Sequence, residues 1–259
     1  MRTLLRVLAT TAAAVLLFAA PGRAQVPATA VTDSGMLVVF DHDLPVAHEK
    51  FTWEWYGDSI IVTANAKRSL ADAEGKRHEY EKTMLVVVDS RDFGLLRYQS
   101  DQRFQDKLAS RGILPGDTVL TYYTEFDQSG NAVRLVQPPG RLFVVDTPMF
   151  SLFDVLVRSL AGKEFERRRV QLLVTSTDTL VMPLATITRG KLDTLQIGSR
   201  RIPAQQFRLE DPSVQFDLWA DTKGRLLRMT HASSGMRVER AQPAAPAPRK
   251  PRARPAQRR

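Results

Sequence analysis

The sequence contains no cysteine, and this absence excludes several kinds of site. It rules out disulfides, thiolate zinc or redox centres, and a lipid-modified cysteine. Histidine is also scarce, with 4 residues in 259. The longest apolar run, residues 7–20, is shorter than the roughly 20 residues that a membrane-spanning helix needs, and no other run is long enough to span. A folded domain in this chain must therefore rely on its own apolar core.

The single long apolar run belongs to an N-terminal pattern typical of exported proteins. Arg2 and Arg6 precede residues 7–20, and the helix-breaking, small-residue segment 21–24 follows them. A positive start, an apolar stretch and small residues at the end are the features of a cleavable signal peptide. We predict a signal peptide over 1–24, export to the periplasm or beyond it, and no membrane span in the mature protein. A membrane anchor is the alternative reading of the same run.

The net charge of +9 resides in the two ends of the chain. The predicted signal peptide holds three arginines and no acidic residue, and residues 241–259 hold six basic residues and no acidic one. The other 28 basic residues are balanced by 28 acidic ones, so residues 25–240 are neutral as a whole. The overall charge is therefore no argument for a nucleic-acid-binding face.

The C-terminal end alternates proline and alanine with basic residues. Because it has no side chain that could form a core, we predict a disordered tail over 241–259. The simplest reading of such a tail is a solvated segment without a partner. The alternative, outside the cytoplasm, is attraction by charge to anionic lipid or envelope polymer, and the tail lacks the aromatic residues expected for nucleic-acid binding. The candidate residues for an anionic surface are Arg249, Lys250, Arg252, Arg254, Arg258 and Arg259.

The region 35–240 is predicted to be one domain, preceded by a flexible linker over 25–34. Its apolar residues alternate or form short β-branched runs, as in 36–40, 51–56, 59–63 and 83–88, and in seven further segments after residue 169. Three Asp-x-x-Gly sequences, at 72–75, 127–130 and 221–224, separate such runs and suit turns with a left-handed glycine. This pattern predicts antiparallel hairpins.

One helix is predicted over about 148–161. Thr147 is placed to cap it, Pro148 suits the first helical position, and Gly162 follows its end. The apolar residues from Met149 to Leu160 cover a broad face, which requires a sheet as its partner.

Residues 101–111 are ambiguous between a short helix capped by Asp101 and a polar edge, and we predict the helix. The expected fold class is mainly β: a curved antiparallel sheet or incomplete β-barrel with one covering or plugging helix.

No motif in the sequence predicts catalysis, a metal or a cofactor. Asp41-His42-Asp43 with His48 is the densest group of metal ligands, but alternate residues of a strand point to opposite faces, so a solvated hairpin is favoured. There is no G-x-S-x-G elbow and no phosphate-binding loop.

The acidic residues Glu210, Asp211, Asp217 and Asp221 lie close in sequence, and a pair of them would suit glycoside chemistry. His78 and His231 are further candidates for a general base. We favour turn-building and solvent-facing roles for the carboxylates.

The aromatic residues point to a different kind of site. Phe51, Trp53 and Trp55 fall on one face of a strand, where they form either a packed core or the wall of an apolar cavity. The candidate cavity residues are Phe51, Trp53, Trp55, Trp219, Met149, Phe153 and Leu156.

Two stretches carry a family resemblance. Residues 216–229 form a strand with Trp219, an Asp-x-x-Gly-Arg-Leu turn and a return strand, and residues 40–51 form an early hairpin. Together they resemble bacterial periplasmic domains of unknown function that share the half-barrel of the lipoprotein-localisation factors LolA and LolB. His42 and Ala47 stand where such domains often have glycine.

The resemblance covers most of 33–240 and implies a curved sheet with helical material in its concave face, able to hold an acyl chain. It carries no catalytic residues. The hypothesis is an exported, non-enzymatic protein that binds an apolar or lipid-like ligand or an envelope component. The alternatives are an envelope-polymer hydrolase using a carboxylate pair or a His/Asp site, and a structural subunit of an envelope complex.

Overall fold

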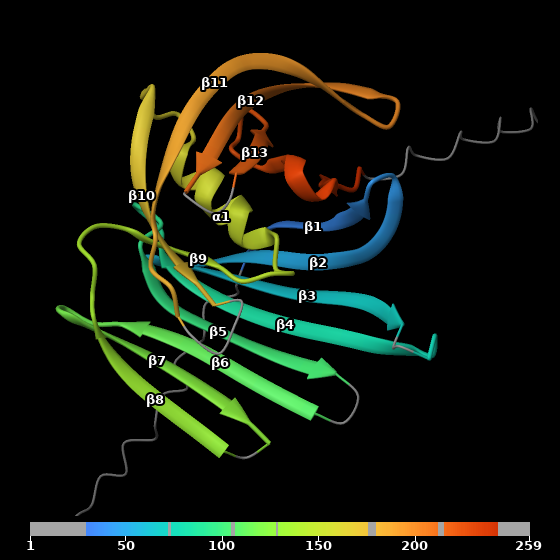
Figure 1. Ribbon diagram of the computed structural model, residues 1–259. Helices are drawn as coiled ribbons and strands as arrows, with labels where there is room; N and C mark the ends of the chain where they lie inside the picture. Colours follow the sequence, from blue (N-terminus) through green and yellow to red (C-terminus); the bar gives the residue numbers. More distant parts are fainter. Residues whose placement is uncertain are drawn as a thin grey trace, which may run out of the picture.

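The computed structural model describes residues 30–242, except 72–73, 105–106, 128, 176–179 and 212–214. Within this part of the chain a single sheet of 15 strands curves around one α-helix (Figure 1). The predicted mainly β class, with one helix against a curved antiparallel sheet, is confirmed. The predicted signal peptide and the six basic candidates of the tail lie outside the described residues.

The strands of the first half are β1 (Ala30–Asp41), β2 (Leu44–Tyr56), β3 (Ser59–Ala71), β4 (Arg77–Asp89), β5 (Leu95–Phe104), β6 (Lys107–Pro115), β7 (Val119–Phe126), β8 (Ser129–Val136) and β9 (Leu142–Val145). Helix α1 (Ser151–Leu160) follows. The second half contains β10 (Arg167–Val174), β11 (Leu184–Ile197), β12 (Arg200–Glu210), β13 (Gln215–Ala220), β14 (Leu226–His231), a 3₁₀ turn (Ala232–Ser234) and β15 (Met236–Arg240).

The sheet is built from two meanders joined by their first and last strands. Strands β1 to β8 pair in sequence order, β10 to β15 do the same, and β1 pairs antiparallel with β15. Strand β9 adds to β10 in parallel, so β8 and β9 are the two edges of an open sheet. Figure 1 shows the second meander and β1–β2 wrapped around α1, while β5–β8 extend beyond it.

Helix α1 fills the concave side of the sheet. Every residue of the helix except Arg158 is buried, and its apolar side chains join one continuous cluster with those of the sheet. The predicted stripe from Met149 to Leu160 therefore packs as expected, with Phe153 meeting the Phe216 ring edge-on at 5.2 Å. The helix occupies the space that a ligand would take in an empty half-barrel.

The helix begins later than predicted. Thr147 and Pro148, joined by a cis peptide bond, belong to a turn in which Met149 N–H donates to the Asp146 carbonyl at 2.7 Å. Phe150 occupies the N-cap position and makes no side-chain capping bond. The prediction of a Thr147 cap is wrong because the cap comes from a distant strand. Gly162, at φ 68°, does follow the helix end as predicted.

The predicted helix over 101–111 is also wrong, since residues 101–104 lie in strand β5 and residues 107–111 in strand β6. Strand β5 is paired on both sides, with β4 and β6. Asp101 caps no helix; its carboxylate accepts a hydrogen bond from the Ser110 hydroxyl on the facing strand at 2.6 Å. Pairing with two neighbouring strands outweighs the weak local signal for a helix.

Two of the three predicted glycine turns have the expected backbone. Gly75 and Gly224 adopt φ of 80° and 77°. Gly130 does not, because it lies within β8 opposite Glu125, and Asp127 takes the positive φ of 46° instead. Strand β1 begins at Ala30, inside the segment expected to be a linker.

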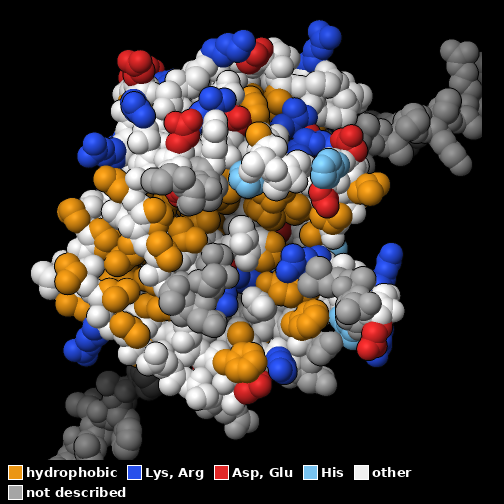
Figure 2. Space-filling model, in the orientation of Figure 1, with side chains coloured by type: hydrophobic (Ala, Val, Ile, Leu, Met, Phe, Trp, Pro, Cys, Tyr) orange, Lys and Arg blue, Asp and Glu red, His pale blue; other side chains and the backbone are white. Residues whose placement is uncertain are grey.

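The surface carries apolar residues at several separate points. The most exposed large ones are Val136, Leu44 and Leu192, from β8, β2 and β11. Figure 2 shows hydrophobic side chains gathered at mid-height on the left of one face, with charged side chains mainly above them. No helix among the described residues is long and apolar enough to cross a membrane.

Candidate binding groove

The long hairpin β11–β12 creates a groove outside the helix-filled interior. The hairpin turns at Gly198, whose φ of 56° suits glycine, and arches over the sheet toward the β1–β15 junction (Figure 1). Two adjoining cavities of about 720 and 280 Å³ lie there and share Arg200, Arg240, Ala241 and Gln242 as lining residues. The smaller cavity lies under the hairpin tip, and we call the two cavities together the hairpin groove.

The lining of the hairpin groove combines apolar and basic side chains. The larger cavity, of about 720 Å³, is within the size range of small-molecule sites, which is about 300–1,000 Å³. The apolar members of the larger cavity include Met36, Phe51, Ile202 and Leu227, and the charged members are Lys50, Arg200, Arg225, Arg240, Asp33 and Asp221. Such a lining suits a ligand that has both an apolar part and a negative charge.

The groove has more positive than negative charge, and the excess has a defined origin. Asp221 pairs with Arg225 at 2.7 Å, and Asp33 pairs with Arg240 at 2.9 Å, so both carboxylates are neutralised within the lining. Lys50 and Arg200 form no ion pair with any residue in the described part of the chain. These two cations are available to an incoming anion.

One wall of the groove is fixed by buried ionic contacts with α1. Arg158 of the helix binds Asp33 of β1, and it also donates to Asp154 at 3.0 Å. Burial acts to raise the pKa of Asp33, but Arg240 and Arg158 outweigh it and the pKa is lowered. For Asp154 burial prevails over the two arginines and raises the pKa. These ionic contacts hold helix α1 against strands β1 and β15 at this wall.

Two cation–π contacts complete the wall. The Arg240 guanidinium lies 4.8 Å from the Phe51 ring centre, and that of Arg158 lies 4.2 Å from Trp53. Stacking on an aromatic face restricts an arginine without using all of its donors. Arg240 is thus positioned in the groove by Asp33 and Phe51 together.

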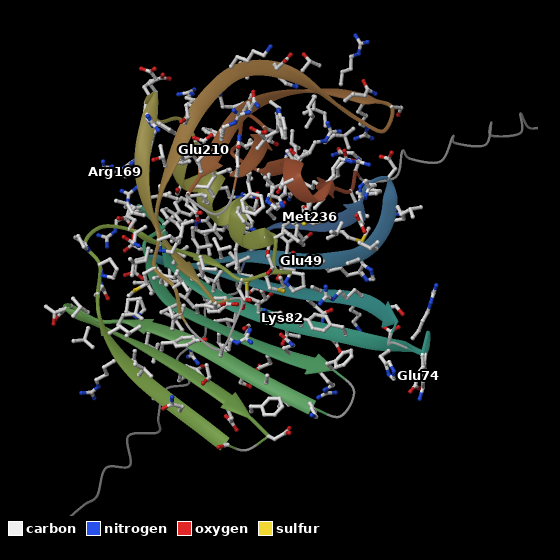
Figure 3. All side chains as sticks on the ribbon, in the orientation of Figure 1. Glu49, Glu74, Lys82, Arg169, Glu210 and Met236 are labelled. Carbon is white, nitrogen blue, oxygen red and sulfur yellow. The ribbon has the colours of Figure 1, made fainter. Side chains whose placement is uncertain are left out.

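At the other end of α1, the barrel wall supplies the missing helix cap. Glu49 of β2 accepts hydrogen bonds from the N–H groups of Phe150 at 2.6 Å and Ser151 at 3.1 Å, and from the Ser151 hydroxyl. Figure 3 shows Glu49 on the strand beside the helix. Burial raises the pKa of Glu49 to about 7, although these hydrogen bonds act to lower it.

A second buried polar network holds the segment before the helix. Lys82 of β4 and Tyr98 of β5 both donate to the carboxylate of Asp146, and Ser100 donates to it at 3.1 Å. Burial lowers the pKa of Lys82, against the effect of Asp146. Figure 3 shows Lys82 on the inner wall, below α1. Because both charges in this network have a partner, the network holds the segment before α1 against strands β4 and β5.

The predicted cavity residues occupy three different places. Phe51 lines the hairpin groove. Trp53, Met149, Phe153 and Leu156 are buried in the core around α1, and Trp55 packs against its edge, 6.0 Å from Trp53. Trp219 lies apart, against the small cluster of Leu195, Ile197, Ala204 and Leu227. Only Phe51 of the seven lines any of the four cavities described for this structure, and a role for the others in ligand binding stays a prediction.

His42, Asp217 and Asp221 are engaged in local contacts. His42 sits in the β1–β2 turn and its ring contacts Asp41 at 2.8 Å. Asp217 pairs with Arg208 at 2.9 Å, and Asp221 accepts backbone N–H groups of Lys223 and Arg225 in its turn. Within the described residues no group of three or more potential ligands is placed to hold a metal ion.

His48 and His231 belong to different surroundings. His48 lines a shallow cavity of about 340 Å³ together with Lys67 and Glu79. His231 lies 5.0 Å from the Phe216 ring and contacts the hydroxyls of Ser234 at 2.7 Å and Ser233 at 3.1 Å. Both serines belong to the exposed 3₁₀ turn that follows β14.

The groove residues Lys50, Arg200, Arg225 and Arg240 were not candidates in the sequence. Each is an ordinary basic residue in a strand or turn, and its neighbours along the chain give no sign of a shared site. Only the pairing of β1 with β15 and the length of the β11–β12 hairpin bring them together.

Comparison with known proteins supports the fold alone. No family model matches the sequence, and no curated protein matches it. Among solved structures, one similar chain is a crystal structure of a β-barrel-like protein of the domain of unknown function DUF1849 from Brucella abortus. The two superpose with a TM-score of 0.51 at 12% sequence identity, over 82% of this chain and 98% of that one. The chain is thus similar in architecture to a β-barrel-like domain of unknown function.

Proposed function

We propose that this chain is an exported binding protein without catalytic activity, and that its hairpin groove takes an anionic amphiphile. The ligand class is a lipid-like molecule or other envelope component with a negatively charged head and an apolar body. The observation that carries the proposal is that two cations without an ion-pair partner, Lys50 and Arg200, line one groove together with the partly exposed apolar side chains of Met36 and Ile202.

The groove suits this ligand better than the interior does. Helix α1 and the sheet form a continuous packed core, so an acyl chain inside the barrel would have to displace α1. The groove is open at the surface, and its wall is already fixed by the Asp33–Arg240 pair. A preformed site loses little conformational entropy when a ligand binds.

Export is the second part of the proposal, and the N-terminal signal-peptide pattern supports it. The basic tail begins next to the groove, since Ala241 and Gln242 line both of its cavities. Tail and groove would then face the same anionic surface. Long-range attraction by the tail would raise the local concentration of ligand at the groove.

The test compares two neighbouring arginines. Arg200 lines the groove, while Arg201 is exposed on the same strand and lines none of the four cavities. Arg200→Gln should weaken binding to phosphatidylglycerol vesicles about tenfold, as expected for the loss of one charge-assisted hydrogen bond, and Arg201→Gln should leave it nearly unchanged. Native mass spectrometry of protein purified without detergent should show a bound anionic lipid. Equal effects of the two substitutions, with nothing bound, would refute the proposal.

A further inference from the structure

A further cavity lies on the opposite flank of the molecule from the hairpin tip. Strand β10 extends past the start of β9, and the segment before β9, the last turn of α1 and β10 enclose a cavity of about 250 Å³. Figure 3 shows Arg169 of β10 on this flank. We call this cavity the arginine pocket, after Arg141, Arg168 and Arg169 in its lining.

The charge of the arginine pocket is one-sided. Three arginines line it and no carboxylate does. Arg141 donates to Asp92 at 3.1 Å, outside the lining. The side chains of Arg168 and Arg169 have no ion pair or hydrogen bond with any residue in the described ranges of the chain. Two guanidinium groups at the pocket therefore keep their full hydrogen-bonding capacity.

The end of the helix does not account for these arginines. Cations often gather near a helix C-terminus because the last carbonyl groups carry partial negative charge. Here Lys163 fills that role, since its ammonium group donates to the Ser159 carbonyl at 2.6 Å. Burial, and then the nearby Arg141 and Arg168, lower the pKa of Lys163. The positive charges thus crowd one another, and a bound anion would relieve that repulsion.

The rest of the lining favours a small and compact anion. Phe143, Leu160 and Val170 are buried and give the pocket apolar walls, which strengthen electrostatic attraction within it. Its volume is below that of typical drug-sized sites. Planar guanidinium groups bind tetrahedral oxyanions through paired hydrogen bonds, so several arginines around one small space suit a phosphate group.

We propose that the arginine pocket binds a phosphate group, either free or at the end of a small molecule or lipid. This site is separate from the hairpin groove and does not depend on the function proposed for it. Arg168, on the same face of β10 as the buried Val170, contacts the anion from the inner side, and Arg169 contacts it from the outer side, past the edge of β10 that β9 leaves unpaired. Arg141, fixed by Asp92, forms the third side. Val170 and Leu160 form the apolar floor.

The test uses three arginines in a row on β10. Arg167 is exposed and does not line the pocket, so Arg167→Gln removes one positive charge from the same strand without touching the site. Isothermal titration calorimetry at low ionic strength with inorganic phosphate and with glycerol 3-phosphate should give saturable binding to the unaltered protein. The double variant Arg168→Gln/Arg169→Gln should bind at least about tenfold more weakly, and Arg167→Gln should bind like the parent.

Two further measurements complete the experiment. Phosphate should raise the thermal unfolding temperature of the parent and of Arg167→Gln but not that of the double variant, which also reports whether that variant is folded. Binding to phosphatidic acid vesicles but not to glycerol 3-phosphate, if lost in the double variant, would identify a lipid headgroup as the source of the phosphate. No binding of any of the three probes, or equal loss of binding in Arg167→Gln, would overturn the proposal. Arg200→Gln should bind phosphate normally, which separates this site from the groove.

Discussion

The carboxylate of Glu49 caps helix α1 through Ser151, 102 residues further along the chain, at 3.1 Å from its backbone N–H and in contact with its hydroxyl. The strand thus supplies the acceptor that the helix lacks in its own sequence. The first N–H groups of a helix need such partners when they are buried, because water cannot reach them. The position of the helix within the barrel is therefore fixed by the wall that surrounds it.

This relationship predicts a specific pH dependence. Burial raises the pKa of Glu49 to about 7 in the folded protein, above its ordinary value of 4.5. Between these two values the folded state holds a proton that the unfolded state releases, so the free energy of unfolding should fall as pH rises from about 4.5 to 7. The contribution is at most roughly 3 kcal/mol.

Urea unfolding of the parent and of Glu49→Gln at several pH values isolates this group, because all other groups titrate in both proteins. The difference in stability between the two should change in favour of the variant as pH rises through this window. A glutamine keeps one oxygen to accept the helix N–H groups, so the variant should still fold. A difference independent of pH would show that Glu49 stays ionised in the folded protein.

The buried Lys82–Asp146 pair predicts strong non-additivity. Removing one partner leaves a buried charge without compensation, so Lys82→Met and Asp146→Asn should each lower the unfolding free energy by about 3–5 kcal/mol. The double variant should lose less than the sum of the two losses, since no charge is left unpaired. The matched control is Lys67→Met, which breaks an exposed pair with Glu81 and should have no measurable effect. Denaturant unfolding of the four variants measures each loss, and additive losses would mean that the pair is not coupled.

Local sequence patterns predicted much of this fold for clear physical reasons. The inward residues of β2, such as Phe51 and Trp53, alternate with outward ones, and the stripe from Met149 to Leu160 has helical spacing. These signals arise from burial of one face, which each segment records by itself. The turns at Gly75 and Gly224 were found for a different local reason, since glycine adopts the positive φ that such turns need without steric cost.

The errors and omissions concern partners that are distant in sequence. Asp101 has the composition of a helix cap, but its carboxylate bonds to Ser110 across a hairpin. Thr147 looks like the cap of α1, whereas Glu49 provides it. The hairpin groove depends on Arg200 meeting Arg240, which needs the closure of β1 on β15. A single sequence does not show which distant strands pair, and it therefore gives no means of finding these sites.

A close contact between two strands gives a third prediction. Gly112 of β6 lies opposite Tyr123 of β7, and a methyl group at Gly112 would fall within 1.9 Å of the tyrosine ring. Gly112→Ala should therefore destabilise the protein by roughly 1–3 kcal/mol, because the ring must leave its position. Tyr123→Ser should restore part of this loss in the double variant, since it removes the clashing ring. Thermal unfolding of the two single variants and the double variant tests the pair, and equal destabilisation with and without the ring would point to a backbone cause instead.

The boundary between the described chain and the basic tail gives the last prediction. Ala241 N–H donates to the Met36 carbonyl at 2.8 Å, and Gln242 lines the groove, so a truncation should keep both residues. A variant that ends at Gln242 loses six basic residues and should unfold at the same temperature as the parent. Its binding to phosphatidylglycerol vesicles should weaken and become less dependent on salt, because fewer charges contribute at long range. If Arg200→Gln in this truncated protein still lowers the remaining binding, the groove and the tail act separately on one anionic ligand. Vesicle binding unchanged by the truncation would show that the tail has no part in it.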